Sequence, residues 1–266
     1  MVENLKLGII TGSELRHRYF ASHLSKYFAV NICFFEKKAN VHERRDFGEG
    51  NSIVKNHFAA RTKSEQQYFG EPEKLVADRI LEIETGTINN EDNVSLIIDA
   101  NPDFVVLFGS SLIKTPILDA FPDRIINLHL GLSPYYRGSG TNFWPMIHGK
   151  PELVGATIHL ATTEVDAGSI LHQVRPVPSP TDNIHDFGNK TIIAATEVLP
   201  EVIFKYHQKK LKAVSQDLSI GVVCKRKDLT AESITLLNEK IENGMIRDYF
   251  NNMETRQKAY PIINNL

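Results

Sequence analysis

Cysteine, a dominant charge sign and long apolar runs are all scarce in this chain. Its 2 cysteines, Cys33 and Cys224, are too few for a disulfide framework and lack metal-ligand spacing, which fits a reducing compartment. The 30 basic and 32 acidic residues give a formal net charge of -2, so there is no general attraction for nucleic acid or an anionic membrane. No stretch approaches the roughly 18 to 20 apolar residues of a membrane span. We therefore expect a cytoplasmic protein without nucleic-acid or membrane partners.

The opening of the chain has a strand, helix, strand pattern. An apolar, β-branched run over 5–11 ends at Gly12-Ser13, and apolar residues at helical spacing lead to a second buried run over 29–35. Such a crossover favours parallel strands. Further strands are expected over 103–109, 124–130 and 154–162, with helices between them. The sequence thus predicts an α/β fold, a Rossmann-like and mostly parallel twisted sheet with flanking helices.

Two regions depart from this alternation. Residues 36–70 form a polar excursion with a helix expected over 52–68, and residues 210–266 form a short C-terminal appendage of strand-like pieces and a helix, with Thr230 as its N-cap. We expect one core over 1–209 and regard the appendage as a candidate homodimer interface. Within the core, Thr115 is expected to cap a helix with Pro116 at its first position, and Pro200 to kink or split a long helix.

Asn127 and His129 are the first candidate functional residues. Alternate side chains of a strand share a face, so both enter one space, at the strand end just before the loop GLSPYYRGSG. A later strand runs into TEVDAGSI and would bring Asp166 to the same place if the two strands are neighbours. Taken alone, a pair such as Asn127 and His129 is more often a satisfied polar pair at a strand end than a catalytic pair. Together with Asp166 they favour a site.

The residue types suit acyl transfer without a covalent enzyme intermediate. The Asn127 amide and a donor form of His129 can stabilise an oxyanion, while Asp166 can orient the imidazole or accept a proton through water. No serine or cysteine occupies a nucleophile-elbow setting, so the attacking group should belong to the substrate.

The stretch from LFGSSLIKTPILDAF through RIINLHLGLSPYYRGSG to VGATIHLATTEVDAGSIL resembles the folate-dependent formyltransferases, which include glycinamide ribonucleotide, methionyl-tRNA and amino-sugar enzymes. The resemblance implies the formyltransferase fold, catalytic Asn127, His129 and Asp166, and 10-formyltetrahydrofolate as co-substrate, without a metal. It also implies folate binding, largely through backbone groups, by two segments. Their residues are Phe108, Gly109, Leu112, Ile113, Thr162, Thr163, Glu164, Val165 and Gly168.

The chain departs from the family pattern at three places, two of which bear on the acceptor. Leu132-Ser133-Pro134 replaces the usual Leu-Leu-Pro, which changes one packing contact. TGSELRHRYF replaces the glycine-rich phosphate loop of the ribonucleotide enzymes, and the residues after the core leave little room for the basic C-terminal domain of the tRNA enzymes. An amino sugar or nucleotide-linked amino sugar is therefore the expected acceptor.

Two groups of residues are candidates for acceptor binding. Gly12, Ser13 and Arg16 could hold a phosphate or form a solvated first helical turn. Tyr135, Tyr136 and Arg137 could clamp the acceptor or pack the loop down. We also hypothesise that the portion HFAARTKSEQQYFG of the excursion forms a helix beside the acceptor site.

Two other functions use the same residues. Formyltetrahydrofolate hydrolases resemble this core, but they add an N-terminal regulatory domain that we do not expect here, since the first strand begins at Leu5. A catalytically silent folate-binding or nucleotide-binding protein of the same fold is the other alternative, and intact Asn127, His129 and Asp166 argue against it.

Overall fold

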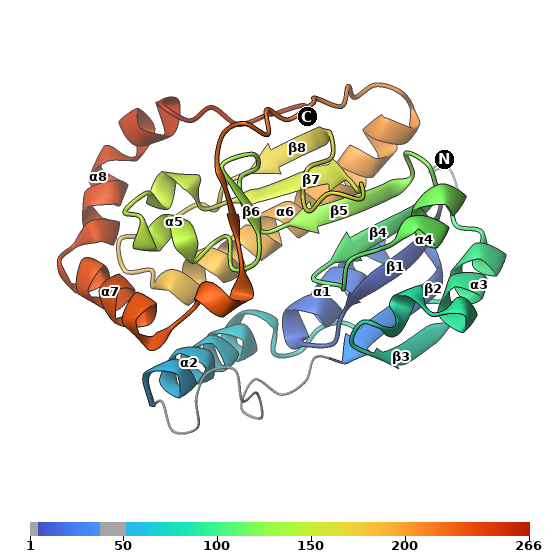
Figure 1. Cartoon of the computed structure of the whole chain (residues 1–266), viewed down its shortest axis with the longest axis horizontal. Coiled ribbons are helices and arrows are strands. Elements are labelled where there is room, and N and C mark those ends of the chain that lie inside the picture. Colours follow the sequence, from blue (N-terminus) through green and yellow to red (C-terminus); the bar gives the residue numbers. More distant parts are fainter. Residues whose placement is uncertain (1–4, 38–51) are drawn as a thin grey trace.

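A seven-stranded sheet organises the part of the chain that the computed structural model describes, residues 5–37 and 52–266. Its strand order is β3-β2-β1-β4-β5-β7-β8, and a small second sheet pairs β6 with β9 (Figure 1). The strands are β1 (Lys6–Gly12), β2 (Ala29–Lys37), β3 (Ile80–Glu84), β4 (Phe104–Phe108), β5 (Ile125–His129), β6 (Tyr136–Gly138), β7 (Ala156–Leu160), β8 (Ile170–Val174) and β9 (Val222–Cys224). The helices are α1 (Leu15–Leu24), α2 (Ser52–Phe69), α3 (Glu91–Ala100), α4 (Thr115–Ala120), α5 (Trp144–Ile147), α6 (Ile184–His207), α7 (Ala231–Glu242) and α8 (Met245–Lys258).

The sheet is parallel from β3 to β5 and antiparallel beyond it. β1 pairs in parallel with β2 and β4, and β4 pairs in parallel with β5. β7 runs antiparallel to both β5 and β8. The predicted α/β architecture with a mostly parallel sheet is confirmed. The change from parallel to antiparallel pairing occurs at β5, the strand that carries Asn127 and His129.

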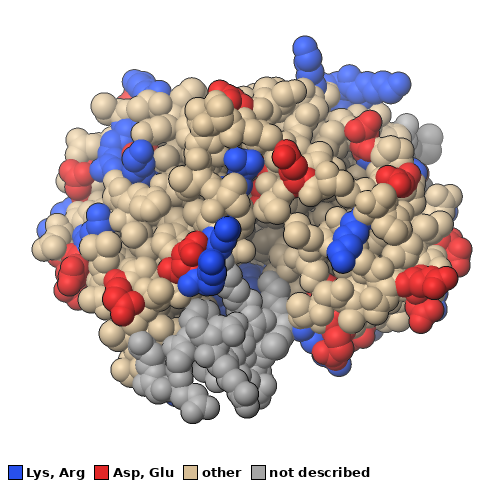
Figure 2. All heavy atoms as spheres, in the orientation of Figure 1, with Lys and Arg blue, Asp and Glu red and all other residues tan. Residues whose placement is uncertain are grey.

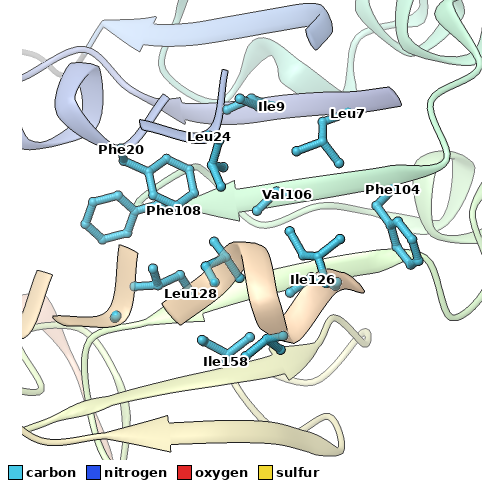
Figure 3. Packing of buried hydrophobic residues seen from close by; sticks show 14 of the residues in the cluster. Leu7, Ile9, Phe20, Leu24, Phe104, Val106, Phe108, Ile126, Leu128 and Ile158 are labelled. Atoms are coloured by element: carbon cyan, nitrogen blue, oxygen red, sulfur yellow. The ribbon is translucent and has the colours of Figure 1, made fainter. Parts of the chain in front are cut away.

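Both faces of the sheet are covered by helices. One face packs against α1 and α6 through buried side chains such as Phe20, Val106 and Leu128 (Figure 3). The opposite face packs against α3 and α4 through Ile10, Ile97 and other apolar residues. A separate cluster joins α2, α5, α7 and α8, and includes buried Phe58, Met146 and Leu237. No helix within residues 5–37 and 52–266 has the length and apolar character needed to cross a membrane.

Local sequence signals locate most helix ends. Asn183 and Asp186 form a reciprocal capping box that starts α6, and Thr230 caps α7 as predicted. The prediction for α4 is wrong by one residue, because Lys114 is the N-cap and Thr115 is already helical. The predicted split at Pro200 is also wrong. Pro200 lies within continuous α6, whose Leu199, Val202 and Ile203 are fully buried, and this packing outweighs the lost backbone hydrogen bond.

The described parts of the polar excursion and of the C-terminal segment make contacts with other elements of the chain. The expected helix at 52–68 is α2, which contacts α6 and α7. Residues 38–51 of the excursion lie outside the described residues. The strand β8 was not expected from the sequence. The one helix expected over 230–250 is divided at Asn243 and Gly244 into α7 and α8, and α8 continues to Lys258.

Candidate active site

Asn127 and His129 lie on the same face of β5, as alternation predicts. Leu128 between them is 2% exposed and belongs to the cluster under α1 and α6, so the two polar side chains project to the opposite face. His129 is 6% exposed. A recess near the middle of the face in Figure 2 lies over the region where β4 and β5 end, and acidic and basic side chains are interspersed around it.

Asp166 reaches this pair, although by a different route from the one predicted. β7 is the neighbour of β5, but it runs antiparallel and ends with Leu160 opposite Ile126. The loop after β7 therefore folds back over β5, with Asp166 in the left-handed region at φ 50°. There Oδ2 of Asp166 lies 3.2 Å from Nδ1 of His129, and Oδ1 accepts a hydrogen bond of 3.1 Å from Nδ2 of Asn127. The three predicted residues thus form one contact cluster.

His159 is a fourth member of the cluster that sequence reasoning missed. It lies directly opposite Asn127 in the β5 and β7 pairing. Its Nδ1 is 2.8 Å from the Leu160 carbonyl, to which it donates, and its Nε2 accepts from Nδ2 of Asn127 over 3.0 Å. Both hydrogens of the Asn127 amide are therefore engaged, one by Asp166 and one by His159. The amide nitrogen must face Asp166, because a carboxylate can only accept.

The loop after β5 closes over the cluster through two backbone groups of β6. The Tyr136 carbonyl lies 3.0 Å from Nε2 of His129, and the Gly138 N–H donates to Oδ2 of Asp166 over 2.8 Å. His129 and Asp166 are consequently held by main-chain groups two residues apart. Only the glycine-rich character of GLSPYYRGSG signalled this close approach in the sequence.

The electrostatics of the cluster fit a proton acceptor. Burial alone would raise the pKa of Asp166, but His129, His159 and the Gly138 N–H lower it to about 2, so the carboxylate is ionised. Burial lowers the pKa of His129, and the Asp166 carboxylate and Tyr136 carbonyl oppose part of that fall. Either neutral tautomer of His129 leaves one ring nitrogen lone pair facing an oxygen. Gaining a proton satisfies both contacts at once.

The segments expected to bind folate flank this cluster. Phe108 is buried at the end of β4, Gly109 follows at φ 63°, and Leu112 is 63% exposed whereas Ile113 is buried. In the segment after β7, Thr162, Thr163 and Glu164 are exposed and Val165 is half-buried. Gly168 is required there, because a Cβ would lie 1.8 Å from the Leu160 carbonyl oxygen. Their role in folate binding stays a prediction.

The residues expected to bind the acceptor differ in how fully their side chains are engaged. Arg16 is paired with Glu65 and, over 3.4 Å, with Glu14. Gly12 and Ser13 precede it at the end of β1, and a Cβ on Gly12 would lie 2.6 Å from the His17 ring. No hydrogen bond or ion pair within residues 5–37 and 52–266 joins Gly12, Ser13 or Arg16 to the cluster.

The loop residues Tyr135, Tyr136 and Arg137 have different surroundings. The Tyr135 ring makes an edge contact with Tyr260 at 5.4 Å, and the Tyr136 hydroxyl is 2.8 Å from Nδ1 of His148. These rings pack the loop down. In the described part of the chain, Arg137 makes no ion pair, and its buried Nε has no hydrogen-bond partner. Arg137 also lies between the two backbone groups that contact His129 and Asp166.

Two surface hollows lie away from the cluster. One of about 510 Å³ is lined by residues of α1 and the end of α2, including Tyr19 and Phe69. The other, about 450 Å³, lies beside the turn between α7 and α8. Neither contains a predicted site residue. We locate the site from the cluster of polar contacts, since chemistry requires those groups.

Known proteins resemble this chain in sequence and in fold. The formyl transferase family model matches residues 8–203, which is most of the chain. The methionyl-tRNA formyltransferase of Finegoldia magna is 30% identical over 122 residues, 46% of this chain, and the chain spans only 39% of that protein's length. A sugar N-formyltransferase from Shewanella sp FDAARGOS_354 has a similar fold, with a TM-score of 0.57 and 15% identity over 87% of this chain and 86% of that one.

A second solved structure has the same fold. Glycinamide ribonucleotide transformylase 1 from Symbiobacterium toebii gives a TM-score of 0.54 and 19% identity, over 80% of this chain and 94% of that one. At such identities the structures support the fold alone, whereas the family model extends over β1 to α6, the elements that build and support the cluster. The chain belongs to the formyl transferase family.

Proposed function

We propose that this chain transfers the formyl group of 10-formyltetrahydrofolate to the primary amine of an amino sugar or nucleotide-linked amino sugar. The observation that carries this proposal is the contact of Asp166 with both His129 and Asn127. An ionised carboxylate, an imidazole that gains from protonation and an amide donor around one space are the groups that attack of an amine on a formyl carbon needs.

His129 takes the proton that the attacking amine loses. The resulting imidazolium donates from Nδ1 to Asp166 and from Nε2 to the Tyr136 carbonyl, so its charge is compensated as it forms. Asp166 remains ionised and holds the ring. Asn127 stabilises the negative charge that develops on the formyl oxygen, and for this one of its amide hydrogens leaves His159 or Asp166.

The donor supplies the formyl carbon. The new bond between this carbon and the acceptor nitrogen is kept as the bond to N10 of the folate breaks, and the imidazolium of His129 returns its proton to N10, so that tetrahydrofolate leaves. The fit of its pterin rests on the segments beside β5, where exposed Leu112 offers an apolar contact and residues 162–164 lie exposed at the surface. The main chain at Ser111 is fixed in place, because its N–H donates to the buried carboxylate of Glu36. A main chain fixed in this way suits recognition of a planar heterocycle.

An anionic acceptor fits the surroundings of Arg137. Its guanidinium has no carboxylate partner among the described residues, and a buried unpaired donor is costly. A phosphate group would satisfy it with charge-assisted hydrogen bonds. This favours a nucleotide-linked amino sugar over a free one. Arg16, already paired with two carboxylates, is less suited to that role.

The experiment is an acceptor screen read by mass spectrometry. Purified protein is incubated with 10-formyltetrahydrofolate and free amino sugars, nucleotide-linked amino sugars, glycinamide ribonucleotide or charged initiator tRNA. We expect a mass gain of one formyl group on a nucleotide-linked amino sugar. Formate release without an acceptor would instead indicate a hydrolase, and no turnover of the donor in any mixture would indicate a silent binding protein.

A variant pair tests the anion contact. Arg137→Met should raise the KM for the phosphate-bearing acceptor about 10- to 100-fold and change the KM for the donor little. Arg247→Met, at an exposed arginine of α8, is the control. An unchanged acceptor KM in Arg137→Met would show that Arg137 does not bind an anionic group of the acceptor.

A further inference from the structure

Gln216 joins the C-terminal part of the chain to the turn that carries Asp166. It lies in the segment between α6 and β9, 50 residues beyond Asp166. Its Nε2 donates to the Asp166 carbonyl over 2.9 Å and to the Gly168 carbonyl over 2.7 Å. A single amide group therefore holds the main chain immediately before and after Ala167.

The backbone on both sides of Gln216 is itself anchored to the site. Two residues earlier, Val214 exchanges both of its backbone hydrogen bonds with Ile170 at the start of β8, at 2.7 and 2.8 Å. Further on, β9 pairs in parallel with β6, the strand whose Gly138 N–H donates to the Asp166 carboxylate. The segment thus contacts both loops that surround that carboxylate.

The held turn is one that needs restraint. Asp166 has a left-handed backbone at φ 50°, a conformation that non-glycine residues rarely adopt. Its side chain must keep contact with His129 and Asn127 while its carbonyl accepts a hydrogen bond from Gln216. Hydrogen bonds to the carbonyls of Asp166 and Gly168 oppose rotation of the turn, and such rotation would withdraw the carboxylate.

Two features argue that the glutamine does more than fill space. Its Oε1 is buried and has no hydrogen-bond partner in the described part of the chain, a feature that lowers stability. In addition, the amide is neutral. A lysine or arginine could donate to the same carbonyls, but its charge would compete with His129 for the carboxylate of Asp166.

We propose that Gln216 is a positioning residue, which holds the Asp166 carboxylate against His129 for the formyl transfer proposed above. This role rests on the proposed function, whereas the effect of Gln216 on the distance between Asp166 and His129 can be measured without it. Gln216 lies beyond residues 8–203, which the family model matches. The segment from Val214 to β9 is then a working part of the active site, not a separate appendage.

The test replaces Gln216 with methionine, which keeps the length of the side chain and removes both donors. Gln216→Met should lower kcat about 10- to 100-fold, the effect of a carboxylate misplaced by about 1 Å, and leave each KM within about twofold. Gln208→Met is the matched control, because Gln208 is exposed at the end of α6. It should keep wild-type kcat.

NMR titration of the His129 ring and the Asp166 carboxyl provides a readout that needs no turnover. The charged and titratable groups facing this pair are each other and His159. If the carboxylate moves away in Gln216→Met, the pKa of Asp166 rises and that of His129 falls. If the wild-type protein formylates no acceptor, the proposed function is wrong. The titrations of His129 and Asp166 would still show whether Gln216 positions the carboxylate.

The outcomes separate a positioning role from a merely structural one. A lower unfolding temperature with unchanged kcat and unchanged His129 and Asp166 titrations would overturn the inference. If Gln216→Met does not fold, Gln216→Asn keeps the amide on a shorter side chain. It should show the same changes in kcat and titration to a smaller extent, and wild-type values in this variant would equally reject the role.

Discussion

The Gly138 N–H donates to Oδ2 of Asp166 over 2.8 Å, which joins the loop after β5 to the carboxylate that follows β7. Gly138 can make this contact because it has φ 93° and because no side chain separates it from β9. A Cβ at this position would lie 2.3 Å from the Cys224 carbonyl oxygen.

Gly138→Ala should therefore reduce both stability and turnover. The backbone has to leave the left-handed region or push β9 away, at a cost of about 1 to 3 kcal/mol, and Asp166 loses a donor. Urea unfolding and steady-state kinetics measure the two effects. Gly188→Ala is the control, because a Cβ at that position in α6 meets nothing within 4 Å, and it should stabilise the protein by about 0.5 to 1 kcal/mol. Full activity in Gly138→Ala would show that the hydrogen bond is dispensable.

Glu36→Gln should weaken binding of the folate donor. Glu36 is 1% exposed at the end of β2, and it accepts from the Gly86 N–H over 3.1 Å and from the Ser111 N–H. The variant turns an amide NH₂ toward one of these donors, so we expect a loss of about 1 to 3 kcal/mol of unfolding free energy. We also expect a higher KM for the folate donor, because Ser111 belongs to the 108–113 segment, and an unchanged KM for the acceptor.

The control for this prediction is Asp103→Asn. Asp103 likewise accepts from a backbone N–H, that of Lys6 over 2.8 Å, but it is only half-buried and lies just before β4. Its donor KM should equal that of the wild type. If Glu36→Gln and the wild type have equal KM values for the folate donor, the 108–113 segment does not bind folate in the way proposed.

His57→Gln should make the protein less sensitive to mild acid. Burial, the neighbouring His185 and Arg61 lower the pKa of His57 to about 3, well below that of the unfolded chain. A group with a depressed folded pKa contributes stability above its unfolded pKa, and this stability is lost as the pH falls. Between pH 8 and pH 5 the variant should therefore lose up to about 2 kcal/mol less than the wild type.

Denaturant unfolding at both pH values measures this difference, and pH 8 is the internal reference because His57 is uncharged there in both states. Parallel stability curves for the two proteins would show that His57 does not contribute to acid sensitivity.

The sequence was sufficient for the elements with simple periodicity. Strict alternation put Asn127 and His129 on one face, and the helix signals of Thr230 were correct. The cross-strand partner His159 was not predictable, because the register of an antiparallel pair is set by tertiary contacts between strands.

Two elements, β8 and most of α8, lack the apolar periodicity by which strands and helices are predicted. β8 contains His172 and Gln173, and Gln173 is satisfied by the Ser133 carbonyl and Thr157, far away in the sequence. The helix α8 has few apolar residues and is held partly by Arg256, which pairs with buried Glu152. Gln216 had no local signal either, since its two partners are about 50 residues away.

The most direct test of the account is the kcat of Asp166→Asn on the acceptor that the screen identifies. Asparagine keeps the shape of the side chain but removes the charge that compensates protonated His129. We predict a fall in kcat of about 10²- to 10⁴-fold in a protein that remains folded by circular dichroism, with His129→Ala showing a similar fall. A kcat within about threefold of wild type in folded Asp166→Asn would contradict proton transfer to His129 beside an ionised Asp166.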